Sequence, residues 1–479
     1  MTSSADISTE APKPRQHYGL TFAALALGAA TFAILQSLVA PALPEIQRDL
    51  HASPTAIAWV LTGYLLSASV LTPIVGRLGD MFGKERTLVI SLAVLAAGSL
   101  LAALATSVEV LIVARVIQGC GGAIFPLSFG IIRDEFPRER VATGIAMISS
   151  ILGIGAGLGI VLAGPIVEAL SYHWLFWIPF FLTVVATIAT VFFVPESPIK
   201  VPGKVNWLGA FLLSSWLVCL LVAISQGSRW GWGDPRIDGL FVAAALLLWA
   251  WIANEQRAAE PLVDMEMMRI RGVWTVNATA FLIGAGMYSS FILIPQFVET
   301  ETSSGYGFGA SVTQAGLFLL PSTLGMLLVS PLAGRLANRV GARVPLVAGC
   351  LATSLAFGFL AFAHEDPWEI YAGSAMLGVG IGLAFASLAN LIVVAVRPDQ
   401  TGVATGMNTV MRTLGGSVGA QVGASVLAAT VIGAALPTEH GYTLGFAVAA
   451  GACGLATLAS LAVPRPATEP AGAVVADLA

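Results

Sequence analysis

Two arginines lie inside stretches of the sequence that are otherwise apolar: Arg115 in LIVARVIQGCGG and Arg412 in MNTVMRTLGG. A charged side chain near the centre of a bilayer costs roughly 3 kcal/mol on insertion scales, so each arginine must face protein or a water-filled cavity. A cation placed there can bind an anionic solute. For Arg115, the alternative is a structural arginine that bonds to neighbouring carbonyl groups. Both arginines can also be satisfied by Gln36 and Gln118.

A group that takes up and releases protons within a membrane-embedded protein is usually a buried carboxylate with a raised pKa. All 27 Asp and Glu residues fall in predicted loops or near the ends of apolar segments. The nearest candidates for proton coupling are Glu168, Asp134, Glu299 and Glu301. We prefer Glu299 and Glu301, because IPQFVETE places them beside an apolar segment, although each of the four can also be a solvated interfacial residue. A passage enclosed by these segments would contain the two arginines and no carboxylate. We therefore predict that it carries positive charge and prefers anionic or neutral solutes.

Uncharged polar residues within the apolar segments are candidates to line a passage, and each can equally bridge two helices. Besides Gln118 these candidates are Gln36, Tyr64, Asn277, Tyr288, Gln296, Asn390, Asn408 and Gln421.

The composition excludes a soluble protein. Apolar residues make up 57% of the chain and charged residues 10%, whereas a soluble domain carries about 25% charged residues. The net charge of -4 and the absence of a basic patch argue against nucleic acid as a partner. The four cysteines lie in apolar segments without metal-ligand or redox spacing. We expect no cofactor, no metal and no enzymatic activity.

Fourteen segments have the roughly 20 apolar residues that a membrane helix needs. They are residues 19–41, 57–75, 87–105, 110–132, 142–167, 175–195, 207–225, 238–254, 274–298, 315–334, 346–363, 370–396, 403–433 and 444–463. With the N-terminal tail and every second loop on one side, eighteen of the 23 Lys and Arg residues fall there and three fall opposite. This asymmetry predicts a multi-pass protein of the cell (inner) membrane with both termini in the cytosol.

The chain repeats itself at a spacing of roughly 260 residues. PIVGRLGDMFGKERTLVI from Pro73 matches PLAGRLANRVGARVPLVA from Pro331, and VATG at 141–144 recurs at 403–406. Such repeats are typical of transporters with a substrate path between two halves. We therefore predict an all-α membrane protein of two six-helix bundles and two inserted central helices. The predicted parts are residues 1–17 (cytosolic tail), 18–196 (first bundle), 197–272 (insert with linkers), 273–464 (second bundle) and 465–479 (cytosolic tail).

The segment from Gly76 to Thr87, GRLGDMFGKERT, is predicted to be a loop of about ten residues. Gly76 and Gly83 permit a tight reversal, Asp80 can cap a helix or pair with a base, and Arg77, Lys84 and Arg86 are expected to hold the loop at the cytosolic surface. These residues form a predicted gate loop. The motif resembles the signature of the major facilitator superfamily, and the segment around Arg115 is similar to the helix-four motif in which that superfamily's arginine is implicated in proton coupling.

The fifth segment reads GIAMISSILGIGAGLGIVLAGP. Gly153 and Gly157, and likewise Gly155 and Gly159, are spaced to let another helix approach closely, and Pro165 can bend the outer end. This run resembles the helix-five motif of exporters in the same superfamily.

Together with ILQSLVAPALP at 34–44, these motifs resemble the fourteen-helix drug/proton antiporter family. The resemblance implies a monomeric secondary exporter in the lipid bilayer that moves small organic molecules out and protons in. Two alternatives remain open at this point: an importer or facilitator of the same fold for a small, possibly anionic, solute, and a membrane sensor that transports nothing.

Overall fold

The structure is a computed structural model that describes residues 18–197, 204–432 and 436–464. The predicted tails, residues 1–17 and 465–479, lie outside the described residues. Within the described part, thirteen helical stretches are long and apolar enough to cross a membrane. The helix α15 (Thr401–Ala429) runs beside them with 29 residues, and its many glycine and hydroxyl residues make it less apolar. Each of the fourteen predicted spans therefore corresponds to helical structure.

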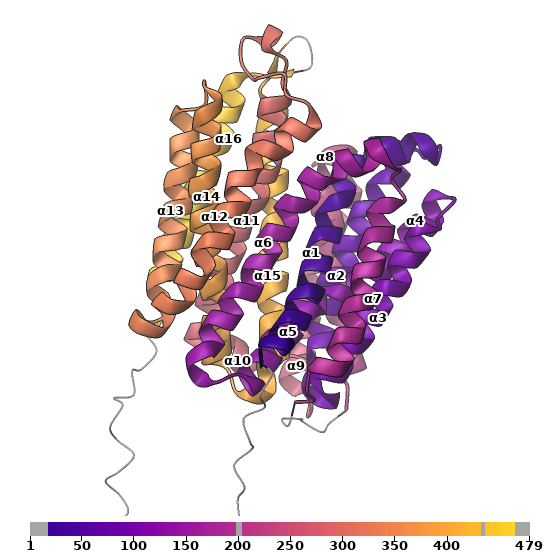
Figure 1. Cartoon of the computed structure of the whole chain (residues 1–479), viewed down its shortest axis with the longest axis vertical. Coiled ribbons are helices and arrows are strands. Elements are labelled where there is room, and N and C mark those ends of the chain that lie inside the picture. The colour runs from indigo at the N-terminus through magenta and orange to yellow at the C-terminus, as the bar shows by residue number, and fades with distance from the viewer. Residues whose placement is uncertain (1–17, 198–203, 433–435, 465–479) are drawn as a thin grey trace, which may run out of the picture.

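The first six spans form one bundle, the indigo-to-magenta half of Figure 1. Its fourth span is divided by a 3₁₀ segment, η1 (Gly119–Ala123), where three glycines occur in five residues. The helices of this bundle are α1 (Tyr18–Asp49), α2 (Pro54–Phe82), α3 (Lys84–Ala103), α4 (Val108–Gln118), α5 (Ile124–Glu135), α6 (Arg138–Ala169) and α7 (Trp174–Phe193).

Two inserted spans follow, α8 (Trp207–Trp230) and α9 (Pro235–Arg257), and the short helix α10 (Met265–Arg269) leads into the second bundle. The eighth span, α9, has 23 residues and is confirmed as a membrane-length helix. The helix α8 packs against α2 of the first bundle and against α15 of the second.

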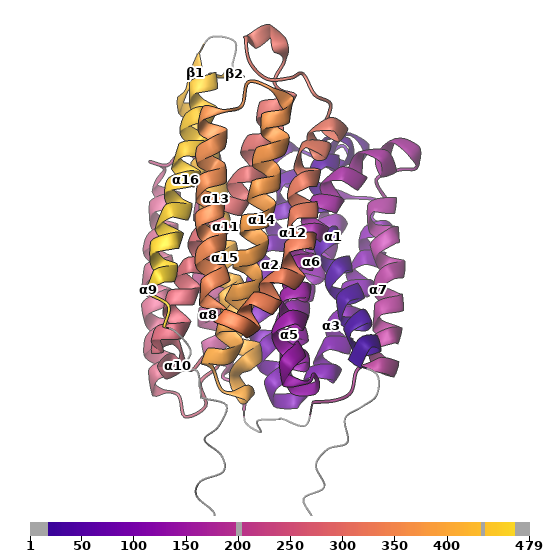
Figure 2. The same cartoon turned by 60° about the vertical axis from the view of Figure 1, so that its left-hand side comes forward.

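The last six spans form the second bundle, coloured from orange to yellow in Figures 1 and 2. Its elements are α11 (Arg271–Glu299), η2 (Thr302–Ser304), α12 (Val312–Val340), α13 (Arg343–Phe362), α14 (Pro367–Ala395), η3 (Pro398–Gln400), α15, β1 (Val431–Ile432), β2 (Leu436–Pro437) and α16 (Glu439–Leu461). The two strands are two residues each and pair antiparallel between α15 and α16. The start of α1 and the end of α16 lie at the same end of the molecule, which we call the predicted cytosolic end (Figure 2).

Large apolar side chains on the outside of the bundles indicate a lipid environment. Phe192, Leu328 and Phe362 are 76%, 77% and 91% exposed. Water would make such exposure unfavourable at roughly 25 cal/mol for each Å² of apolar surface, whereas lipid tails would not. The chain is therefore a multi-pass membrane protein.

The predicted loop of about ten residues at 76–87 is wrong. The helix α2 continues to Phe82 and α3 begins at Lys84, so Gly83, with φ of 114°, is the only residue between the two helices. The apolar segment ends at Arg77 because charged residues follow. The backbone hydrogen bonds of α2 nevertheless continue to Phe82, beyond the point where the helix leaves the hydrocarbon. The reversal needs a backbone conformation that favours glycine.

Candidate functional site

The helix α6 is packed between a helix of its own bundle and a helix of the other bundle. Methyl groups added to Gly155 and Gly159 would overlap α1, and methyl groups added to Gly153 and Gly157 would overlap Met326 and Thr323 of α12. The two i,i+4 glycine pairs therefore use two faces of the same helix. The predicted close packing is present on both faces, and Pro165 lies within α6, at its outer end.

The second bundle contains a contact that resembles the one between α6 and α1 in the first bundle. Methyl groups added to Gly415 and Gly419 of α15 would overlap the backbone of α11. A matched hydrogen bond joins each pair of helices: Ser37 Oγ donates to the Gly155 carbonyl at 3.0 Å, and Ser289 Oγ donates to the Gly419 carbonyl at 3.0 Å. Close contact at glycines therefore recurs in the second bundle, but the aligned glycines differ in their partners. Gly153 and Gly157 align with Gly415 and Gly419 in the repeat, yet they contact α12 of the other bundle.

Two helix pairs make the most extensive contacts between the bundles, and we call them seams. In the α6–α12 seam, Ser150 hydrogen-bonds to Ser330, and a methyl group added to Gly334 would lie 2.6 Å from Thr143 Cα. In the α2–α15 seam, a methyl group added to Gly76 would lie 2.6 Å from the Gly402 carbonyl oxygen. Residues without side chains thus allow the backbones of opposite bundles to touch.

A small cavity lies between the bundles and near the middle of the spans, and we call it the central cavity. Its volume is about 30 Å³, room for water but not for an organic solute. It is bounded by α1, α2, η1, α5 and α6 on one side and by α11 and α15 on the other. The lining residues are Phe32, Gln36, Leu65, Ala68, Ser69, Thr72, Gly122, Phe125, Leu152, Tyr288, Thr409, Val410, Arg412 and Thr413.

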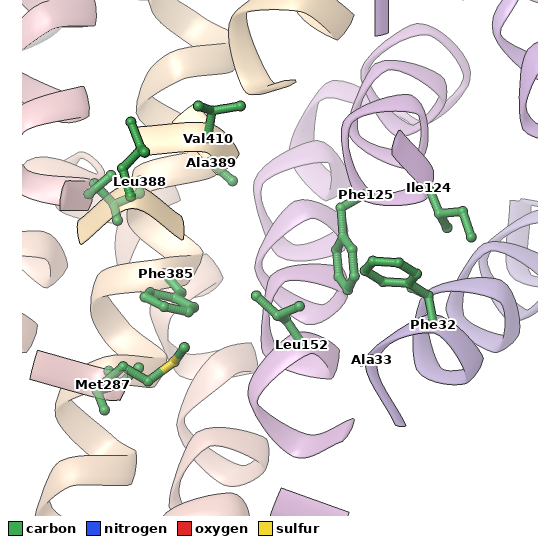
Figure 3. Packing of buried hydrophobic residues seen from close by; sticks show 14 of the residues in the cluster. Phe32, Ala33, Ile124, Phe125, Leu152, Met287, Phe385, Leu388, Ala389 and Val410 are labelled. Carbon is green, nitrogen blue, oxygen red and sulfur yellow. The ribbon is translucent and has the colours of Figure 1, made fainter. Parts of the chain in front are cut away.

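One polar contact in the central cavity crosses from one bundle to the other, and a second lies within the second bundle. Gln36 Nε2 of α1 donates to the Tyr288 hydroxyl of α11 at 3.1 Å. Arg412 places its guanidinium carbon 4.8 Å from the centre of the Phe385 ring, a cation–π contact. Figure 3 shows Phe385 on the second bundle, and Leu152, Phe125 and Phe32 on the first. Among the described residues, the cavity thus combines apolar side chains, hydroxyl and amide groups, and one fixed cation.

Arg115 occupies a different place, inside the first bundle. It is fully buried, and its guanidinium donates to the Gln118 side chain at 2.8 Å, to the Val60 carbonyl at 3.2 Å and to the Leu35 carbonyl at 3.5 Å. It also lies 4.0 Å from the centre of the Tyr64 ring. Gln118 in turn donates to Ser99 at 3.1 Å. These contacts match the carbonyl-bonded arrangement given above as the structural alternative, and none of Arg115, Gln118 and Tyr64 lines the central cavity.

The predicted cytosolic end of the α2–α15 seam is closed by a buried carboxylate. Asp80 is 1% exposed, and its two oxygens accept the backbone N–H groups of Gly402 and Val403 at 3.2 and 3.1 Å. These are orphan donors at the start of α15, where the helix dipole also favours a negative charge. The carboxylate of one bundle thereby holds the helix end of the other.

Lys84 lies next to Asp80 and stabilises this contact. It is fully buried, and its ammonium group lies 2.6 Å from the Asp134 carboxylate and 4.0 Å from that of Asp80. The expectation that Lys84 sits at the surface is therefore wrong, because two carboxylates compensate its burial. Arg86 does lie at the surface, with a side chain that is 73% exposed and 3.5 Å from Glu196, while Arg77 is half-buried.

Two asparagines and an arginine make further contacts between the bundles at the predicted cytosolic end. Asn338 Nδ2 of α12 donates to the Glu139 carbonyl of α6 at 2.9 Å, and Asn390 Nδ2 donates to the Ala142 carbonyl at 3.1 Å. Arg133 donates to Thr401 Oγ1 at 2.7 Å and to the Val396 carbonyl at 2.9 Å. The bundles are thus bonded together on this side of the central cavity.

The sequence profile of the Major Facilitator Superfamily matches residues 25–420 of the chain. The chain belongs to this superfamily. Multidrug resistance protein 3 of Bacillus subtilis (strain 168) is 29% identical over 384 residues, which cover 79% of this chain and 74% of that protein. The tetracenomycin C resistance and export protein of Streptomyces glaucescens is 29% identical over 393 residues, 80% of this chain and 71% of that protein.

A solved structure with the same fold is that of the human organic anion transporter MFSD10. It superposes with a TM-score of 0.65 at 18% sequence identity and covers 94% of this chain and all of that one. At this identity the likeness shows the fold alone. The chain is thus a major facilitator transporter, a multi-pass protein that handles small molecules in a membrane.

Other polar residues predicted to line the path of this major facilitator protein take different positions. Asn408 Nδ2 donates to Asn277 Oδ1 at 2.9 Å, so this buried pair joins α15 to α11 within the second bundle. Gln296 is exposed near the outer end of α11. Gln421 borders a separate, largely apolar groove of about 560 Å³ between α8, α9 and α15. Gln36, Tyr288 and Arg412 are the predicted polar residues that reach the central cavity in this conformation.

The four proton-coupling candidates also lie in different environments. Glu168, Glu299 and Glu301 are exposed at the outer ends of their spans. Asp134 is bonded to Lys84 and to Ser197 beneath the α2–α15 seam. Among the described residues, no cluster of three or more His, Cys, Asp or Glu side chains could hold a metal ion.

Several cavity and seam residues escaped the sequence analysis. Phe32, Phe125 and Leu152 were indistinguishable from ordinary core residues, and Thr409 and Thr413 from helix hydroxyls. The sequence did contain a signal for Asn338, because the repeat aligns this residue with Asp80.

Proposed function

We propose that this chain is a secondary active exporter of drugs, antibiotics or related small organic molecules, a fourteen-helix drug/proton antiporter that works by alternating access. In this proposal it is a monomer of the cell membrane, and both termini are cytosolic. The names of the relatives, a multidrug resistance protein and a resistance and export protein, support the substrate class. The excess of basic residues at one end supports the orientation.

The observation that carries the proposal is the closure of the central cavity at one end by bonds between the bundles. Three hydrogen-bonded contacts cross from one bundle to the other at the predicted cytosolic end. Asp80 accepts from the start of α15, Arg133 donates to Thr401, and Asn338 donates to the Glu139 carbonyl. A cavity of about 30 Å³ cannot admit an organic solute. Loading from the cytosol therefore requires these bonds to break, which is the motion that alternating access describes.

Proton influx can supply the energy for such a cycle. One proton moving down about 100 mV provides about 2.3 kcal/mol, enough to hold a neutral solute at an outside-to-inside ratio of roughly fifty. Of the four proton candidates, Asp134 is the one in contact with the α2–α15 seam. It supplies one of the two charges that compensate Lys84, so a change in its charge would loosen the cytosolic closure, and we assign the coupling role to it.

Two assays test the function. The first is a susceptibility panel in a strain without its own pumps, in which cells that make the protein should survive higher concentrations of several antibiotics. The second measures uptake of an affected antibiotic into inverted membrane vesicles with an acidic lumen, with and without nigericin to collapse the proton gradient. Gradient-dependent uptake supports antiport, and Asp134→Asn should abolish that dependence.

The alternatives give different results in the same vesicles. A facilitator would equilibrate the antibiotic with or without the gradient, and an importer would not fill the vesicles at all. A sensor would change neither survival nor uptake. Any of these three results contradicts the proposal.

A further inference from the structure

We infer that Arg412 is the binding site for the carboxylate, or a similar anionic group, of an amphiphilic organic acid whose apolar body lies against the walls of the central cavity. The inference rests on the proposed function and names the substrate class of the same site. It differs from the sequence expectation, in which Arg115 and Arg412 both contributed positive charge to the passage.

The structure separates the two arginines by their partners. Arg115 is enclosed by carbonyl groups and Gln118 within the first bundle. Arg412 lines the central cavity, and within the described part of the chain its guanidinium has no hydrogen-bonding or ion-pair partner beyond the Phe385 ring. A membrane-embedded cation without a protein counter-charge needs another source of compensation. A bound anion provides it.

The surroundings of Arg412 favour an anion over a cation. The residues that line the central cavity include no Asp and no Glu in the part of the chain that the structure describes. The Tyr288 hydroxyl accepts from Gln36, so its own hydrogen remains available as a second donor. The hydroxyls of Thr409 and Thr413 already donate to carbonyls of α15. The free donors of the site therefore include the guanidinium, the Tyr288 hydroxyl and the second amide N–H of Gln36, and all three suit a carboxylate.

The remaining walls specify the rest of the ligand. Phe32, Phe125 and Leu152 line the same cavity on the first bundle. Aromatic and aliphatic side chains bind an apolar body without regard to its detailed structure, while a guanidinium fixes an oxyanion in a planar, bidentate geometry. The chemistry of these side chains suits an aromatic or aliphatic group that carries one carboxylate. Such a ligand enters when the bundles separate, because the closed cavity is too small for it.

The test is a binding measurement on the purified full-length protein in detergent by isothermal titration calorimetry. The three probes are 2-naphthoate, its neutral analogue 2-naphthamide, and ethidium. The wild-type protein should bind the carboxylate at least about tenfold more tightly than the amide, the change expected from one charge-assisted hydrogen bond. Arg412→Gln should bring that ratio close to one and leave the amide affinity unchanged.

Two further variants separate recognition from folding. Arg412→Lys keeps the charge but loses the planar fork, so it should retain an intermediate ratio. Arg257→Gln removes an exposed arginine at the end of α9 and should leave the ratio at the wild-type value. A melting temperature within a few degrees of wild type in all variants shows that the fold is retained. If Arg412→Gln does not fold, the ratio in Arg412→Lys decides, and a wild-type ratio there contradicts the inference.

Three results would overturn the inference. The wild-type protein binds the amide or ethidium more tightly than the carboxylate, or it binds none of the three probes, or Arg412→Gln weakens carboxylate and amide equally. Failure of the proposed function appears elsewhere, as the absence of resistance in the susceptibility panel. A protein that confers resistance but prefers ethidium would retain the export function and lose the anion site.

Discussion

At the predicted cytosolic end, α2 meets α15 and α12 meets α6, and the aligned repeat places Asp80 at the first seam and Asn338 at the second. Asp80 is 1% exposed and accepts two backbone N–H groups of α15, whereas Asn338 is exposed and donates once to a carbonyl of α6. The position that holds buried Lys84 in the first repeat holds Ala342 in the second. Duplication therefore preserved the packing of the seams but not their electrostatics.

The difference gives the two seams different sensitivities. Bonds between a carboxylate and a helix N-terminus depend on charge, and protonation weakens them. A neutral amide bond to a carbonyl has no comparable response to protons. We expect the α2–α15 seam to respond to protonation and the α6–α12 seam to act as a permanent contact, and four predictions test this contrast.

Lys84→Ala should cause the largest loss. Removing one partner of a buried ion pair leaves an uncompensated charge and costs about 3–5 kcal/mol of unfolding free energy, here mainly at Asp134. Thermal unfolding in detergent, followed by circular dichroism, measures it. The double variant Lys84→Met with Asp134→Leu should lose much less, since an apolar pair can replace a buried ion pair. Equal losses in the single and double variants would show that charge compensation is not the cause.

Asp80→Asn should weaken the cytosolic closure by about 1.5–3 kcal/mol, the range for hydrogen bonds to a charged group. The closed population should fall by a factor of roughly 10 to 150 relative to the open one. Distances between spin labels at positions 86 and 339, at the cytosolic ends of α3 and α12, report the two populations by electron–electron resonance. An unchanged distance distribution would mean that Asp80 does not hold the bundles together.

Two glycine-to-alanine substitutions, one at each seam, should have unequal effects because one new methyl group meets backbone and the other meets a flexible side chain. In Gly76→Ala the new methyl group meets the Gly402 carbonyl oxygen at 2.6 Å, and because a backbone cannot yield, overpacking should cost about 1–3 kcal/mol. In Gly153→Ala it meets the flexible Met326 side chain, and the better helix propensity of alanine offsets part of the overlap, so the change should stay within about 1 kcal/mol. Melting temperatures of the two variants compare them directly. The opposite ranking would contradict the assignment of backbone contact to the α2–α15 seam.

Asn338→Ala should have the smallest effect, about 0.5–1 kcal/mol, because a single exposed neutral hydrogen bond is lost. The spin-label pair at positions 86 and 339 should report nearly wild-type distances. A shift as large as that of Asp80→Asn would remove the distinction between the two seams.

The site was predictable from the sequence only in part. The glycine spacing of the fifth segment indicated a close helix contact, because the i,i+4 geometry of a helix fixes which residues share a face, and the structure has such contacts on two faces. The extent of the gate segment was wrong, since hydropathy marks where a helix leaves lipid rather than where it ends. The burial of Lys84 was also missed, because its partner Asp134 lies fifty residues away in the sequence and contacts it only after folding.

By itself the sequence determined the number and order of the spans, the duplication of the bundles and the asymmetry of charge between the two sides. Each of these follows from local properties, because the bilayer sets the cost of every residue according to its own polarity and depth. Arg115 and Arg412 looked alike at that level: both are cations in apolar runs. Only the tertiary structure placed the first among carbonyl groups inside a bundle and the second at the central cavity, because the direction in which a helix presents a side chain depends on which neighbours pack against it.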